Sequence, residues 1–122
     1  MPKKILIVED EKLLGEMYKD KLSRAGFEVI WAFEAKDALK LVKKEKPDLI
    51  LLDILLPREN GIFFLEQLRK WPKIVSIPIL AFSNYDDSMT QKQALKLGVK
   101  DYLIKTDYTP NEIIKKIKSY LK

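Results

Sequence analysis

The stretch Pro47-Asp48-Leu49-Ile50-Leu51-Leu52-Asp53-Ile54-Leu55-Leu56-Pro57-Arg58-Glu59-Asn60-Gly61 decides the fold prediction. Its apolar residues 49–52 have the length and the flanks of a strand buried on both faces. That strand ends in the carboxylate of Asp53, and an isolated buried acid is costly unless something compensates it. Pro57 and the pair Asn60-Gly61 then stop the strand and mark a loop. Asp53 is therefore expected at the carboxyl end of a central strand, where open parallel sheets bind their ligands.

The length and the composition indicate a small globular protein. With 122 residues, of which 47% are hydrophobic and 34% charged, the chain is expected to form one domain around a single core. No apolar run approaches the about 20 residues that span a bilayer, and no signal-peptide pattern follows Met1. We therefore expect a cytoplasmic protein without membrane insertion.

The residue types that are missing exclude several kinds of chemistry. The chain has no Cys and no His, which excludes disulfides, thiolate catalysis, imidazole bases, and thiolate or imidazole metal sites. A metal would have to be a hard ion bound by oxygen atoms. The formal net charge of +5 comes from lysines spread along the chain, so a solvated basic surface is favoured over direct nucleic-acid binding.

Hydrophobic periodicity divides the chain into alternating strands and helices. Short apolar runs predict strands at residues 4–8, 28–31, 49–52, 78–82 and 102–104. Apolar residues three and four apart predict helices from residue 12 to a stop at Gly26, over 35–42, 62–71 and 88–97, and after Thr109. The residues Thr109-Pro110-Asn111-Glu112 have the pattern of a capping box with Pro at the first helical position. This alternation predicts an α/β protein with a parallel sheet that helices cover on both faces.

Polar residues after the strands are expected to meet at one edge of this sheet. Glu9 and Asp10 follow the first strand, Asp53 the third, Ser83 the fourth and Lys105 the fifth. Converging carboxylates repel each other and raise their pKa values unless a divalent cation neutralises them. Mg²⁺ fits better than Ca²⁺, because it binds through one or two carboxylates and keeps several waters. Such a pocket suits a phosphoryl group on Asp53, with Lys105 and Ser83 donating to its oxygens.

Each of these residues also has an ordinary structural interpretation. Asp10 alone suits the N-cap of the first helix, and Lys105 alone suits a solvated lysine at a strand end. Ser83 alone is a common loop residue. Asp53 after a buried apolar run is harder to explain in this way, and the matched strand ends together favour the functional interpretation.

At these residues the sequence resembles the receiver domain of two-component response regulators. The resemblance covers the whole chain, from Ile5-Leu6-Ile7-Val8-Glu9-Asp10-Glu11 through Asp53-Ile54-Leu55-Leu56-Pro57 with Gly61 to Ser83 and Tyr102-Leu103-Ile104-Lys105. It implies a flavodoxin-like, doubly wound fold with strand order 2-1-3-4-5. It also implies one receiver domain over residues 1–122. Because the chain ends with its last expected helix, we expect no effector domain in it.

The resemblance assigns a role to each residue at the sheet edge. Asp53 would accept a phosphoryl group from a sensor histidine kinase or a histidine phosphotransfer protein. Asp10 and Asp53 would bind Mg²⁺ directly, together with the backbone carbonyl of Leu55, and Glu9 would bind it through water. Ser83 and Lys105 would bind the phosphoryl group.

The family also implies how the phosphoryl group is read by a downstream protein. Ser83 would move toward it and Tyr102 would rotate inward, which would remodel the surface formed by the fourth helix, the fifth strand and the fifth helix. On its residue type alone, Tyr102 is an ordinary strand aromatic. Homodimerisation through this surface is compatible with the family, but the sequence offers no specific support for it.

Several positions depart from the family pattern. Glu9 stands where many members have Asp, and Asn84 replaces the usual small residue beside the phosphoryl group. Thr106 replaces the proline that commonly follows the lysine. Because a non-proline cis bond costs about 2.5–4 kcal/mol, we predict a trans bond between Lys105 and Thr106, or otherwise a strained loop.

The prediction is thus a phosphorylation-dependent signalling switch and not an enzyme with a separate substrate. Leu55 and Tyr85 flank the expected pocket, and we predict that they exclude water and make the phosphoryl group long-lived. The alternative, a Mg²⁺-dependent phosphohydrolase with an aspartyl-phosphate intermediate, needs a second carboxylate where Leu55 stands. The intact acceptor set disfavours a pure interaction module. A flavodoxin-like cofactor binder is disfavoured because no glycine- and hydroxyl-rich loop follows the first strand.

Overall fold

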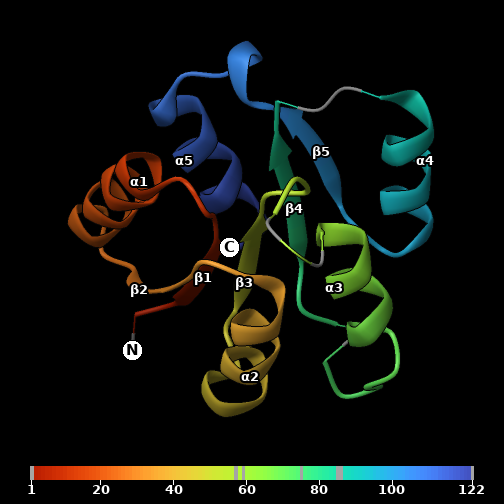
Figure 1. Cartoon of the computed structure of the whole chain (residues 1–122). Helices are drawn as coiled ribbons and strands as arrows, with labels where there is room; N and C mark the ends of the chain where they lie inside the picture. Colours follow the sequence, from red (N-terminus) through yellow and green to blue (C-terminus); the bar gives the residue numbers. More distant parts are fainter. Residues whose placement is uncertain (1, 57, 59, 75, 85–86, 122) are drawn as a thin grey trace.

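The computed structural model describes residues 2–56, 58, 60–74, 76–84 and 87–121. Parallel strands form one sheet in the order β2-β1-β3-β4-β5, which confirms the predicted fold class and strand order (Figure 1). The strands are β1 (Lys4–Val8), β2 (Glu28–Ala32), β3 (Leu49–Leu52), β4 (Ile79–Ser83) and β5 (Asp101–Ile104). The helices are α1 (Lys12–Arg24), α2 (Ala35–Glu45), α3 (Gly61–Leu68), α4 (Ser88–Lys96) and α5 (Pro110–Tyr120), and a 3₁₀ turn, η1 (Lys105–Asp107), follows β5.

The core has two layers, one on each face of the sheet. Alternate residues of each central strand point to opposite faces, so in β3 Ile50 and Leu52 pack with α2, α3 and α4. Leu49 and Leu51 pack with α1 and α5 on the other face. This double burial explains why the central strands are continuous apolar runs, since each of their side chains is covered by helices.

The helix ends follow the local signals in most places. Gly26, with a φ of 98°, lies just after α1, and Thr109 and Glu112 form the predicted capping box of α5. The predicted end of α3 at Trp71 is wrong, because the helix ends at Leu68 and the chain continues in tighter turns. Trp71 still packs against the core, so its spacing from the apolar residues of α3 fits a helical pattern. Pro72 follows Trp71, and a residue before proline is disfavoured in the helical conformation, so the helix does not extend that far.

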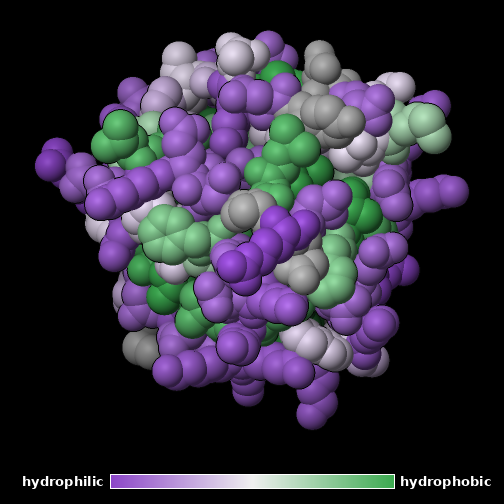
Figure 2. All heavy atoms as spheres, viewed as in Figure 1, coloured by the Kyte–Doolittle hydropathy of each residue, from purple (hydrophilic) through white to green (hydrophobic). Residues whose placement is uncertain are grey.

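Hydrophilic residues cover most of the side of the molecule seen in Figure 2, where the hydrophobic residues lie in separate patches. The helix α2 is longer than predicted because its last turn faces solvent. Lys43 and Lys44 are exposed there, so this turn adds no apolar residue to the periodic pattern from which the helix was predicted. None of the described helices is long and apolar enough to cross a membrane.

Candidate functional site

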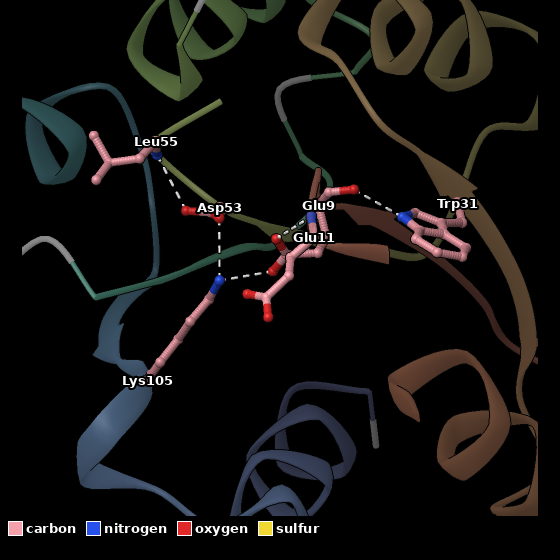
Figure 3. A network of polar contacts seen from close by, with 6 residues as sticks. All are labelled: Glu9, Glu11, Trp31, Asp53, Leu55 and Lys105. Atoms are coloured by element: carbon pink, nitrogen blue, oxygen red, sulfur yellow. Dashed lines mark hydrogen bonds and ion pairs between the residues drawn. The ribbon is translucent and has the colours of Figure 1, made fainter. Parts of the chain in front are cut away.

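The carboxyl ends of the strands bring the predicted polar residues to one edge of the sheet. Val8 of β1 is paired with Leu52 of β3, so Glu9 and Asp53, which follow them, lie at the same level. The Asp53 backbone N–H donates to the Val8 carbonyl at 2.9 Å, which continues the ladder by one residue. Lys105 reaches the same place from the end of β5 (Figure 3).

The Lys105 ammonium lies between two buried carboxylates. Its Nζ is 2.7 Å from Glu9 Oε1 and 3.1 Å from Asp53 Oδ2. The three side chains are 11%, 4% and 7% exposed, respectively. The interpretation of Lys105 as a solvated strand-end lysine is therefore wrong, because its side chain is largely buried and its ammonium pairs with both carboxylates.

Three carboxylates gather at this edge in a way that suits a hard cation. One carboxylate oxygen from each of Glu9, Asp10 and Asp53 lies within 4.8 Å of the other two. Asp10 is exposed, and the α1 N-cap position belongs to Glu11, whose side chain makes no cap hydrogen bond. The structure thus gives no support to Asp10 as the helix cap. An all-oxygen set with one exposed member fits Mg²⁺, which retains water ligands.

The pKa of Glu9 is raised from 4.5 to about 7, chiefly because burial disfavours its charged form. The hydrogen bonds from Lys105 and from the Glu11 backbone N–H, the latter at 3.0 Å, oppose this shift, while the charge of Asp53 adds to it. For Lys105, burial favours the neutral amine, but the Glu9 and Asp53 carboxylates outweigh burial and raise its pKa. The charges of this site therefore depend on one another.

The turn after β3 orients the Asp53 carboxylate. Its Oδ1 accepts a hydrogen bond from the Leu55 backbone N–H at 3.1 Å, and its Oδ2 faces Lys105. The Leu55 side chain is half exposed and points away from Asp53 (Figure 3). The role predicted for the Leu55 carbonyl as a metal ligand stays a prediction.

The other predicted residues lie around this centre. Ser83 is fully buried at the end of β4, and Asn84 after it is exposed. Tyr102 is half-buried in β5 and packs against the core on the α2, α3 and α4 face. Thr106 is exposed in η1, and the predicted trans bond before it is confirmed. Tyr85 lies outside the described residues.

Sequence reasoning missed Trp31, which contacts the site from β2. Its indole Nε1–H donates to the Glu9 carbonyl at 2.9 Å (Figure 3). The usable signal was Gly15, since a glycine inside a helical pattern costs about 1 kcal/mol relative to alanine and often marks a close approach. A Cβ at Gly15 would lie 2.1 Å from the Trp31 ring.

Gly61 holds the turn after Asp53 close to the start of α3, so we expect Gly61→Ala to disturb the site. Its N–H donates to the Ile54 carbonyl at 2.7 Å, and a Cβ there would lie 2.8 Å from Ile54 Cα and 3.0 Å from the Asp53 carbonyl oxygen. Since backbone must shift, urea denaturation should show a loss of about 1–3 kcal/mol. The Asp53 side chain should shift relative to Lys105 as well, which a crystal structure of the variant would show.

Asn60→Ala is the matched control for Gly61→Ala. The Asn60 side chain caps α3 by accepting a hydrogen bond from the Phe63 N–H at 3.1 Å, and its loss should cost about 1 kcal/mol without moving Asp53. An equal displacement of Asp53 in both variants would mean that the Gly61 contact is not what positions Asp53.

The fold and this acidic edge belong to one known family. Residues 5–118 match the family model of the response regulator receiver domain. The chain therefore belongs to the receiver domain family of two-component response regulators, and its function is that of a phosphorylation-dependent signalling switch. Receiver domains are switches and not classical enzymes, and they interact with histidine kinases or phosphotransfer proteins and with effectors. They bind Mg²⁺ at an acidic pocket.

Individual relatives support the same assignment. The alkaline phosphatase synthesis transcriptional regulatory protein PhoP of Bacillus subtilis is 38% identical over 122 residues, which are 100% of this chain and 50% of that relative. This chain thus spans about half the length of the relative. The BeF3-activated N-terminal receiver domain of RstA from Klebsiella pneumoniae is 30% identical with a TM-score of 0.87, over 98% of this chain and 99% of that chain. A CheY-like receiver domain protein from Methanospirillum hungatei is 29% identical with a TM-score of 0.90, over 99% and 94%.

Proposed function

We propose that this switch is set by transfer of a phosphoryl group to Asp53. The observation that carries the proposal is the position of its carboxylate, 3.1 Å from the Lys105 ammonium and within 4.8 Å of oxygens of Glu9 and Asp10. A nucleophilic carboxylate beside a fixed cation and a set of oxygen ligands has the parts that phosphoryl transfer needs. The donor would be a sensor histidine kinase or a histidine phosphotransfer protein.

In the transfer, an Asp53 carboxylate oxygen forms a bond to phosphorus while the bond from phosphorus to the donor atom breaks. The leaving group departs with that electron pair, and the product is an acyl phosphate. Lys105, whose Nζ is 3.1 Å from Asp53 Oδ2, would offset the charge of the phosphoryl oxygens, and Ser83, at the end of β4, would donate its hydroxyl to one of them. Mg²⁺ held by Asp10, Asp53 and the Leu55 carbonyl, with Glu9 bound through water, would neutralise the remaining charge.

The readout would run through β4 and β5. Ser83 is paired with Ile104, and Tyr102 is paired with Ala81 two residues earlier on β4, so a shift of Ser83 acts on the strand that carries Tyr102. Inward rotation of Tyr102 would then change the surface of α4, β5 and α5, where Leu95 and Tyr120 are exposed. We infer that a downstream protein reads this surface, and homodimerisation through it stays a prediction.

Intact-mass spectrometry tests the proposal directly. The wild-type chain is incubated with acetyl phosphate, in one sample with Mg²⁺ and in another with a chelator. We expect a single phosphoryl adduct that requires Mg²⁺. A folded chain that binds Mg²⁺ and never acquires the adduct would refute the proposal.

We expect Leu55→Asn to shorten the lifetime of the phosphoryl group. Leu55 follows Asp53 by two residues, and its half-exposed apolar side chain offers no hydrogen bond to an attacking water, whereas an amide there can hold one. Dephosphorylation, followed by loss of the adduct after the donor is removed, should become several-fold faster. Leu13→Asn, at a leucine of α1 that is 77% exposed, is the control and should leave the rate unchanged.

A further inference from the structure

We propose that Trp31 is a positioning residue that holds the acidic segment Glu9-Asp10-Glu11 in the geometry that binds Mg²⁺. This inference rests on the Mg²⁺ site of the proposed function. Two consecutive residues at the end of β2 bind the Glu9 backbone: the Trp31 indole N–H donates to its carbonyl at 2.9 Å, and the Ala32 carbonyl accepts from its N–H at 3.0 Å. Both backbone polar groups of Glu9 are therefore tied to β2.

The side-chain carboxylate of Glu9 lies among the charged groups of the site. Its carboxylate accepts from Lys105 at 2.7 Å and from the Glu11 N–H at 3.0 Å, and Lys105 in turn contacts Asp53 (Figure 3). A continuous set of contacts thus links the Trp31 indole to the acceptor carboxylate. Because the three carboxylates repel one another, the segment that carries two of them needs an external restraint.

The indole itself has little freedom to move. A Cβ on Gly15 would lie 2.1 Å from its Cζ2 atom and 2.3 Å from its Cε2 atom, so α1 rests directly on the ring. The Phe33 ring covers it at a centroid distance of 4.5 Å. Gly15 is also bound to the acidic segment, since its N–H donates to the Glu11 carbonyl at 2.9 Å. Gly15 and Trp31 therefore act as a pair that fixes the direction of the indole N–H.

Groups that orient metal ligands without touching the metal typically change metal affinity about 10–100-fold when they are lost. The test compares Trp31→Phe, which keeps a ring but removes the donor, with the control Trp71→Phe at the only other tryptophan. Calorimetric titration with Mg²⁺ should show a dissociation constant about tenfold higher for Trp31→Phe, at the low end of that range, and unchanged for Trp71→Phe. Equal affinities in the two variants would overturn the inference.

Two further measurements separate positioning from simple packing. In the Trp71→Phe background the tryptophan fluorescence comes from Trp31 alone. Mg²⁺ should change this fluorescence saturably, with the same dissociation constant as the calorimetric titration gives. Fluorescence that does not respond to Mg²⁺ would contradict the inference even if Trp31→Phe fails to fold. Gly15→Ala, which displaces the indole, should also weaken Mg²⁺ binding, but it should add nothing in the Trp31→Phe background. Additive losses would mean that the two residues act separately.

The outcomes also distinguish this inference from the proposed function. If the wild type binds Mg²⁺ and forms the adduct while Trp31→Phe does both equally well, only the role of Trp31 is refuted. If the wild type binds no Mg²⁺, the metal site and the role of Trp31 are refuted together.

Discussion

Replacing Asp53 with asparagine should abolish the phosphoryl adduct and leave the fold intact. The amide has no carboxylate oxygen to attack phosphorus, so no covalent product can form at this position. The asparagine oxygen can still accept the hydrogen bond that the Leu55 N–H donates at 3.1 Å. Intact-mass spectrometry after incubation with acetyl phosphate and Mg²⁺ measures the adduct, and urea denaturation measures the fold.

The effect of Asp53→Asn on stability should be small for an electrostatic reason. Asp53 raises the pKa of Glu9 by repulsion, so replacing its carboxylate with a neutral amide removes a repulsion that destabilises the fold. The same replacement also removes one of the two carboxylates that pair with Lys105. Lys105 keeps its shorter contact, at 2.7 Å, to Glu9. These two effects have opposite signs and largely cancel.

Asp87→Asn is the matched control for this experiment. Asp87 caps α4 through a hydrogen bond from the Thr90 N–H at 3.0 Å, and asparagine caps a helix equally well. This variant should keep both the adduct and the stability of the wild type. A full adduct on Asp53→Asn would place the phosphoryl group on another residue.

Much of this fold could be predicted because its signals are local. β1 and β3 have the predicted bounds, since a strand buried on both faces appears in the sequence as an uninterrupted apolar run. The start of α5 was equally clear, because a capping box needs specific residues at fixed spacing. The strand order could not be derived in this way, because no local signal records which strands become neighbours, and it came from the family resemblance.

The site shows the same division between local and long-range information. Residues after parallel strands must meet at one edge, so the convergence of Glu9, Asp53 and Lys105 could be predicted. Their contacts could not, because the reach of a lysine side chain across the sheet depends on register and rotamers. The roles of Gly15 and Gly61 were missed for a related reason: each glycine leaves room for atoms far from it in the sequence or across a turn.

Lys105→Met should destabilise the protein strongly at alkaline pH. Methionine fills a similar volume but leaves the buried carboxylates of Glu9 and Asp53, 4% and 7% exposed, without their cation. Removing one partner from a buried ion pair costs about 3–5 kcal/mol, and we expect about 3 kcal/mol at pH 8 by urea denaturation. Lys116→Met is the matched control, because its pair with Asp101 at 3.2 Å is 38% and 31% exposed and should contribute less than about 1 kcal/mol.

The pH dependence gives this prediction its sign. Glu9 loses its proton near 4.5 in the unfolded chain and near 7 in the folded one, so its contribution to stability is complete below 4.5 and is lost as the pH rises through 7. Lys105 lowers the pKa of Glu9, so without it the folded chain keeps the proton to still higher pH. The part of the difference between Lys105→Met and the wild type that comes from Glu9 should therefore be small at pH 5 and grow as the pH rises above about 7.

Mg²⁺ should partly rescue Lys105→Met, because a cation among the carboxylates replaces the charge that the ammonium supplied. In the wild type, Lys105 already neutralises part of the charge of Glu9 and Asp53, so the same Mg²⁺ concentration should add less stability there than in the variant. Lys116→Met should respond to Mg²⁺ as the wild type does. Its partner Asp101 is the first residue of β5, whereas the carboxylates of the site lie at the carboxyl ends of the strands. An equal Mg²⁺ response in all three proteins would show that Lys105 and the metal do not share these carboxylates. The proposal that Lys105 and Mg²⁺ together neutralise the site for phosphoryl transfer would then be refuted.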